Sequence, residues 1–302
     1  MKTHFILSIF YSIATFGAWL CMKLIETTKT HSILSQVFYA DLVGSLIIFI
    51  FCVLTNSFSI YDPYWSVKNV VFIFYFCTIS AKWMSNLRVL FTILLVLVWS
   101  SRLTIQCLNS MPDYRHEDWR YTNFGKKLNS HGFLYFSFGF LTFILLPTTV
   151  VYFAGAVPMY NIIYLNVNNT ALNVFDIIGF SVTLTGILFE TVADIQLRNH
   201  LNDKKFKEKS ITSGLWSWCR HPNYFGEITF WIGLYIIGVA SDSSLINETF
   251  YLSSFVFGAF SIFLIIYFGS LPMMEERQLE KRRHTYSNYM KEVRWKLLPL
   301  NC

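Results

Sequence analysis

Charged residues are scarce in this chain of 302 residues. Asp, Glu, Lys and Arg make up 14% of it, whereas an average soluble domain carries roughly 25%. The mean hydropathy of +0.44 excludes intrinsic disorder, which requires low hydrophobicity and a high net charge, and it argues against a soluble globular enzyme. Because a lipid-embedded bundle uses about 20 residues for each span, the sequence predicts a polytopic membrane protein.

The sequence also lacks any Cys-x-x-Cys pair. This absence excludes a zinc module and a recognisable disulfide framework, so we expect no metal site. The excess of 24 basic over 18 acidic residues forms no basic stripe on a soluble domain, so we expect no nucleic-acid partner. Most cysteines lie in or beside apolar segments, where they behave as small hydrophobic residues; the six are Cys21, Cys52, Cys77, Cys107, Cys219 and Cys302.

Eight apolar stretches are present, and we expect them to be helices. An isolated apolar run in lipid must satisfy its own backbone hydrogen bonds, and the run 94–98 does not alternate as a barrel strand would. The predicted fold is an all-α polytopic transmembrane bundle of about seven or eight spans, forming a single membrane domain over residues 1–302. The stretches cover residues 5–22, 37–55, 66–81, 87–108, 132–154, 171–190, 226–241 and 250–271.

Lys and Arg are distributed unevenly among the loops. They are absent from segments 155–170 and 242–249 but frequent in 109–131, in 191–225 and in the tail after residue 272. The positive-inside rule places the three basic segments in the cytosol, together with a polar C-terminal helix. The N-terminal half is less regular. When eight spans are counted, four basic residues fall on the non-cytosolic side: Lys23, Lys29, Lys82 and Arg88.

Two glycosylation sequons agree with this orientation. They begin at Asn168 and Asn247, and both fall in loops that lack Lys and Arg. Glycosylation acceptors lie on the luminal side of the secretory pathway. We therefore predict a multi-pass protein of the endoplasmic reticulum membrane with a cytosolic C-terminus.

Ionisable residues inside or beside spans are functional candidates, because lipid makes them costly. Glu190, Asp194 and Arg198 follow one another at i, i+4 and i+8, so they share a helix face. They either line a cavity that opens to the cytosol or form an exposed helix end. In the second case the Asp194–Arg198 ion pair contributes a few tenths of a kcal/mol to helix stability.

The densest polar cluster lies in residues 213–227. The fork of Arg220 suits phosphate, because it donates two parallel hydrogen bonds. His221 is able to titrate near neutrality, and Glu227 lies one helical turn beyond Asn223 on the same face. A juxtamembrane belt of basic and aromatic residues does not require this combination, so we interpret the segment as a binding site.

Three weaker clusters remain. The tail segment 273–280, followed by Tyr286 and Tyr289 at i and i+3, is either part of a site or an amphipathic helix on the bilayer surface. The loops 61–66 and 117–121 place acidic residues beside aromatic ones at membrane boundaries. They either contact a ligand or only expose polar groups to water.

These motifs resemble those of a known family. The run Arg220-His221-Pro222-Asn223-Tyr224-Phe225-Gly226-Glu227, preceded by Ser213-Gly214-Leu215-Trp216, resembles the signature of the DUF1295 proteins, which belong with the steroid 5-alpha-reductase C-terminal domain family. The resemblance covers about residues 55–300. Sterol C=C reductases and isoprenylcysteine carboxyl methyltransferases carry stretches similar to the central part of the run. The similarity extends to residues 62–66, 117–121, 190–196 and 272–289.

The resemblance implies an integral-membrane, NADPH-dependent oxidoreductase acting on the CH–CH group of a lipid-like substrate such as a steroid, a sterol or an enoyl lipid. Residues 1–131 would then shape a lipid-accessible substrate cavity, and residues 132–302 would hold the cofactor. Trp99 stands three residues before Arg102, where steroid reductases carry a tyrosine, so a 3-keto steroid is not implied. The implied cofactor-binding residues are Asp194, Arg198, Arg220, His221, Asn223, Arg277 and Tyr286, and the candidate acids for the chemical step are Glu227, Tyr224 and Asp62.

Two alternatives stay open. In an S-adenosylmethionine-dependent methyltransferase acting on a membrane-embedded thiol or a phospholipid head group, Arg220 and His221 would suit the carboxylate, while Glu275 and Glu276 would suit the ribose. A small cavity ending at Glu275 would favour this reading, and two basic contacts for a phosphate would favour NADPH. A non-catalytic transporter or scaffold would explain the spans but not the density of polar groups in 213–227.

Overall fold

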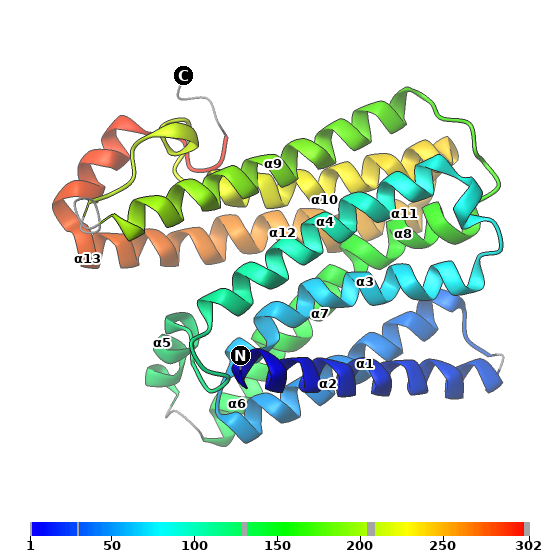
Figure 1. Ribbon diagram of the computed structural model, residues 1–302, viewed down its shortest axis with the longest axis horizontal. Coiled ribbons are helices and arrows are strands. Elements are labelled where there is room, and N and C mark those ends of the chain that lie inside the picture. Colours follow the sequence, from blue (N-terminus) through cyan, green and yellow to red (C-terminus); the bar gives the residue numbers. More distant parts are fainter. Residues whose placement is uncertain (1, 29, 129–131, 204–208, 299–302) are drawn as a thin grey trace. The chain divides into compact units, whose positions relative to one another are not determined.

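Helices make up the regular structure of the chain. The computed structural model describes residues 2–28, 30–128, 132–203 and 209–298, and within these ranges it contains helices and no strand (Figure 1). Seven helices of the described part are long and apolar enough to cross a membrane, which confirms the predicted all-α polytopic bundle. Lys204, Lys205 and Lys207 of the basic segment 191–225, and Cys302, lie outside the described residues.

The seven candidate spans correspond to seven of the eight predicted stretches. The remaining stretch, 66–81, lies mostly in α3 (Tyr61–Ile79), which carries Asp62, Lys68 and Asn69 and is not among the seven. The spans are Thr3–Thr28, Ile33–Thr55, Leu87–Ser110, Phe133–Leu165, Val174–Asn202, Pro222–Ser241 and Thr249–Glu292.

The chain forms two compact units, residues 1–170 and 171–302. The roles predicted from the sequence divide the chain between residues 131 and 132. That boundary lies before the long apolar helix 133–165, whereas the boundary between the two units lies after it. This helix packs within the first unit, against α2 (Ile33–Thr55) and α3. The separate roles assigned to 1–131 and 132–302 stay predictions.

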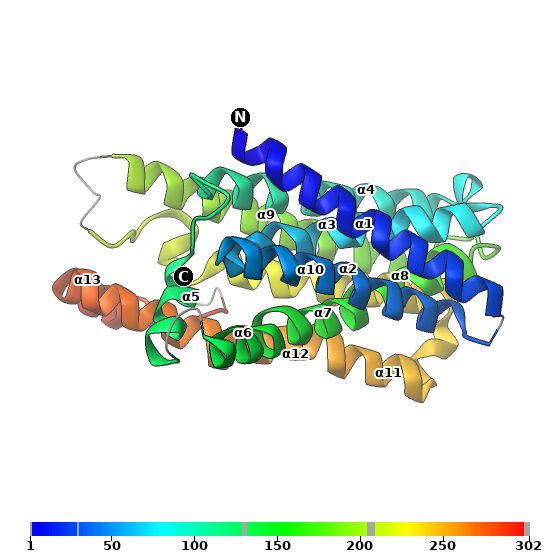
Figure 2. The same cartoon turned by 90° about the horizontal axis from the view of Figure 1, so that it is seen from below.

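The first unit begins with a helical hairpin. Helix α1 (Lys2–Thr28) lies along α2 in both views (Figures 1 and 2). Ser32 caps the start of α2 by accepting a hydrogen bond from the backbone N–H of Ser35. Asn56 ends α2 in the left-handed conformation, with φ of 55°. A 3-10 turn, Phe58–Ile60, then leads into α3, which packs on α4 (Leu87–Ser110).

The short helix α5 (Trp119–Lys127) follows α4, and the long helix 133–165 completes the first unit. This long helix consists of α6 (Phe133–Gly139), α7 (Leu146–Val151) and α8 (Val157–Tyr160), joined by π-helical turns. An aromatic cluster around the fully buried Phe58 joins the elements, since its ring contacts those of Phe49, Tyr121, Tyr135, Phe136 and Phe143.

In three places a π-helical turn ends two residues before a proline. Proline lacks the N–H that an α-helix needs and clashes with the carbonyl of the preceding turn, and a wider turn relieves both problems. Apolar spans therefore tolerate these prolines without a break. The pairs are Phe140–Leu145 with Pro147, Tyr152–Ala156 with Pro158, and Ile265–Ser270 with Pro272.

The second unit is built on a close pair of helices. Helix α9 (Val174–Asn202) lies beside α10 (Pro222–Ser241) along most of its length (Figures 1 and 2). A Cβ atom at Gly186 would lie 2.5 Å from the backbone nitrogen of Phe230, and one at Gly226 would lie 2.6 Å from that of Glu190. Glycine at these positions lets the two backbones touch.

The second unit ends with a continuous helical segment from Thr249 to Glu292. It includes α11 (Thr249–Phe255), α12 (Ser261–Leu264) and α13 (Leu271–Glu292), again with π-helical turns between them. Inside α13, Arg282 has non-helical backbone angles, with φ of −140° and ψ of 42°. The kink lies within the polar part of the segment, which begins at Glu275.

Arg88 is not a surface charge, so it should be left out when the positive-inside rule is applied to the first unit. Its side chain is fully buried, and its Nη1 donates to the carbonyl of Asn169 at 2.6 Å. Asn86, which caps α4, donates to the same carbonyl and to that of Val167. The start of α4 and the loop that contains Asn168 are therefore tied together on one side of the unit.

Candidate functional site

The segment 213–216 is fastened to the end of α9. Gly214 has a φ of +63°, and a Cβ atom there would lie 2.4 Å from the side-chain amide of Gln196. Gln196 accepts a hydrogen bond from the N–H of Leu215 at 3.0 Å, and the indole of Trp216 donates to the carbonyl of Ala193 at 3.0 Å. The Ser-Gly-Leu-Trp motif therefore sets the path of the loop.

Arg220 and His221 pair with the chain that follows α13. The backbone N–H groups of Arg220 and His221 donate to the carbonyls of Trp295 and Lys296, at 2.9 and 3.0 Å. The guanidinium Nη1 of Arg220 also donates to the carbonyls of Val293 and Arg294, at 2.8 and 2.7 Å. Arg220, the arginine predicted to bind phosphate, thus uses several of its N–H donors to hold the C-terminal segment in place.

Glu275 is the centre of a buried charge cluster. Its carboxylate accepts from Arg220 Nε at 2.7 Å, approaches His221 Nε2 to 3.3 Å and lies 3.7 Å from Lys296 Nζ. Burial lowers the pKa of His221, although the nearby carboxylate opposes that shift. The imidazole is therefore held in its neutral form near neutral pH.

These elements surround a cavity, here called the motif cavity, of about 630 Å³ with its open mouth included. Its wall is largely apolar, with a small number of polar and basic groups, which is the usual composition of a small-molecule site. The lining residues are Leu197, His200, Ser210, Ile211, Trp216, Arg220, His221, Asn223, Tyr224, Met274, Gln278, Arg282, Tyr286 and Tyr289.

Asn223 presents an unused hydrogen-bond acceptor at this cavity. Its Nδ2 donates to Asp194 Oδ1 at 3.2 Å, which fixes the orientation of the amide. Its Oδ1 is buried and has no hydrogen-bond partner in the described part of the chain. A buried acceptor without a partner is costly, so a ligand that brings an N–H or O–H donor would gain a hydrogen bond there.

The structure brings together five of the predicted site residues at the motif cavity and separates others from it. Arg220, His221, Asn223, Tyr224 and Tyr286 line the cavity, and Asp194 adjoins it through Asn223. The wall, as far as the described residues form it, does not include Arg198, Arg277 or Glu227. Their roles stay predictions.

Arg198 and Glu227 have environments of their own. Arg198 is exposed on the last turns of α9. Glu227 is buried, and its Oε1 accepts a hydrogen bond from the indole of Trp231 at 2.8 Å, one turn further along α10. An i, i+4 bond of this kind needs no ligand, so it is an ordinary structural use of the carboxylate.

On α13, sequence reasoning named Gln278 only as part of the weak candidate segment 273–280, and it missed Arg282. The side chains of Gln278 and Arg282 both line the cavity, and Arg282 Nη1 donates to Gln278 Oε1 at 2.8 Å. Their i, i+4 spacing is a usable signal. However, the polar run of α13 contains several such pairs, and only the kink at Arg282 distinguishes this one.

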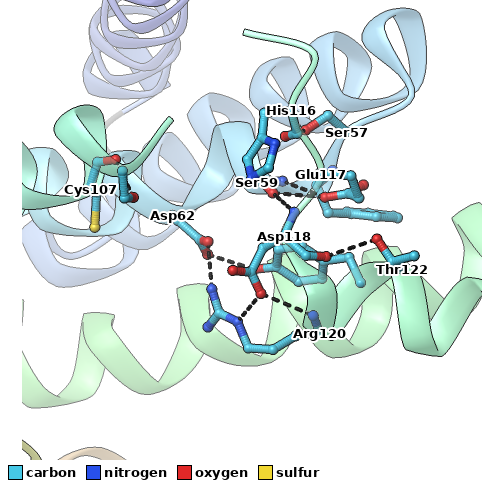
Figure 3. Close-up of polar contacts among 12 residues, drawn as sticks. Ser57, Ser59, Asp62, Cys107, His116, Glu117, Asp118, Arg120 and Thr122 are labelled. Carbon is cyan, nitrogen blue, oxygen red and sulfur yellow. Dashed lines mark hydrogen bonds and ion pairs between the residues drawn. The ribbon is translucent and has the colours of Figure 1, made fainter. Parts of the chain in front are cut away.

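Asp62 belongs to a different polar cluster, in the first unit. Figure 3 shows its carboxylate facing Arg120, whose Nη2 donates to Asp62 Oδ2 at 2.7 Å, while Tyr121 donates to the other oxygen. Arg120 Nε also donates to Asp118 at 2.7 Å. The two sequence segments predicted as weak sites, 61–66 and 117–121, are thus brought together.

The same cluster fastens the segment after α4 to the start of α3. Glu117 accepts hydrogen bonds from the backbone N–H groups of Phe58 and Ser59, at 2.9 and 3.2 Å, and from the hydroxyl of Ser59 at 2.8 Å (Figure 3). The N–H of Asp118 donates to that same hydroxyl at 2.7 Å. These contacts account for the conformation of the loop, and the catalytic role of Asp62 stays a prediction.

Comparison with known proteins identifies the family. Residues 48–293 match the family described as "Protein of unknown function (DUF1295)", so the chain belongs to that family, as its motifs predicted. An uncharacterized protein of Schizosaccharomyces pombe is 26% identical over 255 residues, which cover 75% of this chain and 69% of the relative. No solved structure matches the chain.

Proposed function

We propose that the chain is an integral-membrane reductase that uses NADPH to saturate a C=C bond of a lipid-like substrate. The observation that carries this proposal is the motif cavity, where His221, Asn223 and Tyr224 of the segment 213–227 meet Arg282 of α13 beside an apolar wall. The resemblance of the same motif to steroid 5-alpha-reductases and sterol reductases supports the reaction class.

The side chains of the cavity suit the parts of a nicotinamide dinucleotide. Arginine binds phosphate oxygens through charge-assisted hydrogen bonds, and Arg282 is the lining residue that would do so; the imidazole of His200 also lines the cavity. Trp216 and Tyr289 offer apolar faces for rings. The unpartnered Oδ1 of Asn223 would accept from an amide or a ribose hydroxyl.

Arg220 takes a revised role in this proposal. Its Nε and Nη1 already serve Glu275, Val293 and Arg294, and a guanidinium has five N–H donors in all. It therefore positions the cavity wall first and contributes at most its remaining donors to an anion. Arg282 replaces it as the main phosphate contact.

When bound, NADPH supplies a hydride to one carbon of the double bond. The protein must deliver a proton to the other carbon, and a positioned general acid performs this step. The phenol of Tyr224 lines the cavity, with its ring centroid 6.0 Å from that of His221. We assign proton donation to Tyr224, with Glu227 and Asp62 as the other candidate acids.

The position of Glu275 argues against the methyltransferase alternative. That alternative needs a carboxylate to hold the ribose of S-adenosylmethionine, but the Glu275 carboxylate is engaged by Arg220, His221 and Lys296. A transporter or scaffold function would not explain why polar side chains gather at the motif cavity. The reductase therefore remains the best-supported function.

Direct binding measurements test the proposal. The detergent-solubilised protein should bind NADPH more tightly than NADH and should not bind S-adenosylmethionine. It should then oxidise NADPH when an enone or enoyl lipid is added, with a loss of the alkene that mass spectrometry detects as a gain of two hydrogens. Tight binding of S-adenosylmethionine without binding of NADPH would refute the reductase.

A further inference from the structure

A second buried charge pair lies in the first unit, whereas the residues of the motif cavity belong to the second unit. Lys68 Nζ of α3 and Asp41 Oδ2 of α2 are 3.0 Å apart, with side-chain exposures of 2% and 1%. Asp41 lies eight residues inside a candidate membrane span, about 12 Å along the helix from its start. Ionisable groups at such depth are costly, and they mark functional sites more often than ordinary packing.

The two charges differ in how completely they are satisfied. Lys68 donates to Asp41 and also to the carbonyl of Thr148, at 3.1 Å, so two of its three N–H groups are used. The second carboxylate oxygen, Asp41 Oδ1, is buried and finds no hydrogen-bond partner among the residues described. A ligand that brings a hydrogen-bond donor would therefore stabilise this oxygen.

A cavity of about 350 Å³, its mouth included, adjoins this pair. We call it the Asp41 cavity. It lies among α1, α2 and α3, and α1 packs mainly along α2 while touching α3 over a short stretch. Its wall is apolar apart from a few groups; the lining residues are Thr15, Ala18, Met22, Val37, Ala40, Asp41, Tyr64, Lys68, Val71, Phe72 and Tyr75.

We propose that the Asp41 cavity binds the hydroxyl end of a lipid alcohol. A neutral ligand suits the site, because the charges of Asp41 and Lys68 already cancel. A hydroxyl is able to donate to Asp41 Oδ1 and to accept the third N–H of Lys68. The apolar wall then receives hydrocarbon. The straight-chain and the polycyclic alcohols share this chemistry.

Photocrosslinking in phosphatidylcholine nanodiscs tests the proposal without any cofactor, so its result is independent of the proposed reductase activity. The probes are a photoactivatable cholesterol analogue and a photoactivatable long-chain alcohol, each paired with its methyl ether, which cannot donate. At least one alcohol should label peptides of α1 or α2 about fivefold more than its ether. The probe that does so identifies the shape of the hydrocarbon.

Two variants localise the label. Ala18→Leu fills the cavity from α1 and leaves the ion pair intact, so it should remove the excess labelling, whereas Leu20→Phe on the exposed side of α1 should retain it. The double variant Asp41→Asn with Lys68→Met removes both charges together and should abolish the preference for alcohol over ether. Three results would overturn the proposal: equal labelling by alcohol and ether, full labelling of Ala18→Leu, or no labelling at all. The last result would mean that the cavity holds water instead of a lipid.

Discussion

Arg220 Nε lies 2.7 Å from Glu275 Oε1, although the two residues are 55 positions apart in the chain. Both side chains are buried, with exposures of 5% and 8%. The contact joins a residue two positions before α10 to the first turns of α13. Because Arg220 also holds the carbonyls of Val293 and Arg294, this one pair organises the part of the second unit in which the motif cavity lies.

Loss of Arg220 should destabilise the protein. Arg220→Ala leaves the Glu275 carboxylate buried with weaker partners, and breaking a buried pair in this way costs about 3–5 kcal/mol. Thermal unfolding of the detergent-solubilised variant measures the loss. Adding Glu275→Ala should cost less than the sum of the two single changes, with a coupling of about 0.5–3 kcal/mol. Strictly additive losses would show that the pair contributes nothing.

Arg282 should dominate the affinity for NADPH. Arg282→Ala removes a charge-assisted contact, which corresponds to about 1.5–3 kcal/mol, or roughly a 10- to 150-fold rise in the dissociation constant. Arg283→Ala is the matched control, because Arg283 is the next residue of α13 but is exposed and does not line the cavity. Equal effects of the two variants would mean that the arginines act only through net charge.

Tyr224 should act on the chemical step. Tyr224→Phe keeps the ring against the cavity but removes the proton, so turnover should fall by about 10²–10⁴ while NADPH affinity changes little. Glu227→Gln, measured in parallel, retains an acceptor for the indole of Trp231. A large loss of turnover in Glu227→Gln at saturating NADPH, with Tyr224→Phe unaffected, would move the proton donor to Glu227.

His221 should make stability depend on pH below neutrality. Burial lowers the pKa of His221 from its ordinary value of 6.5, so the unfolded chain binds more protons than the folded one as the pH falls through 6.5. Stability should therefore decrease from pH 7 towards pH 5.5. His221→Gln should flatten this decrease in the melting temperature, whereas His4→Gln, at an exposed position, should not. An unchanged slope in His221→Gln would assign the dependence to other groups.

The orientation is testable without any assumption about activity. Asn168 and Asn247 are exposed, and both should carry glycans when the protein is made in microsomes, while a C-terminal tag should be digested by added protease. Asn168→Gln and Asn247→Gln should each remove one glycan from the gel shift. Protection of the tag in sealed microsomes would reverse the predicted cytosolic C-terminus.

The sequence alone determined the membrane bundle and the principal motif. Span positions follow from local hydropathy, since each helix must satisfy its own backbone in lipid. The motif 213–227 can be recognised in the sequence for a similar reason, namely that its structure is local. Gly214 takes a positive φ, and Pro222 begins a helix, so residue type and local conformation coincide there.

Tertiary structure decided how the polar groups are used. Arg220 and Glu275, or Asp62 and Arg120, are 55 and 58 residues apart, and nothing local in the sequence pairs them. The kink that marks Arg282 and the unpartnered oxygens of Asn223 and Asp41 likewise arise from packing. Hydropathy is a property of each residue, whereas a hydrogen-bond partner is a property of position in space, and the helices must assemble before that position exists.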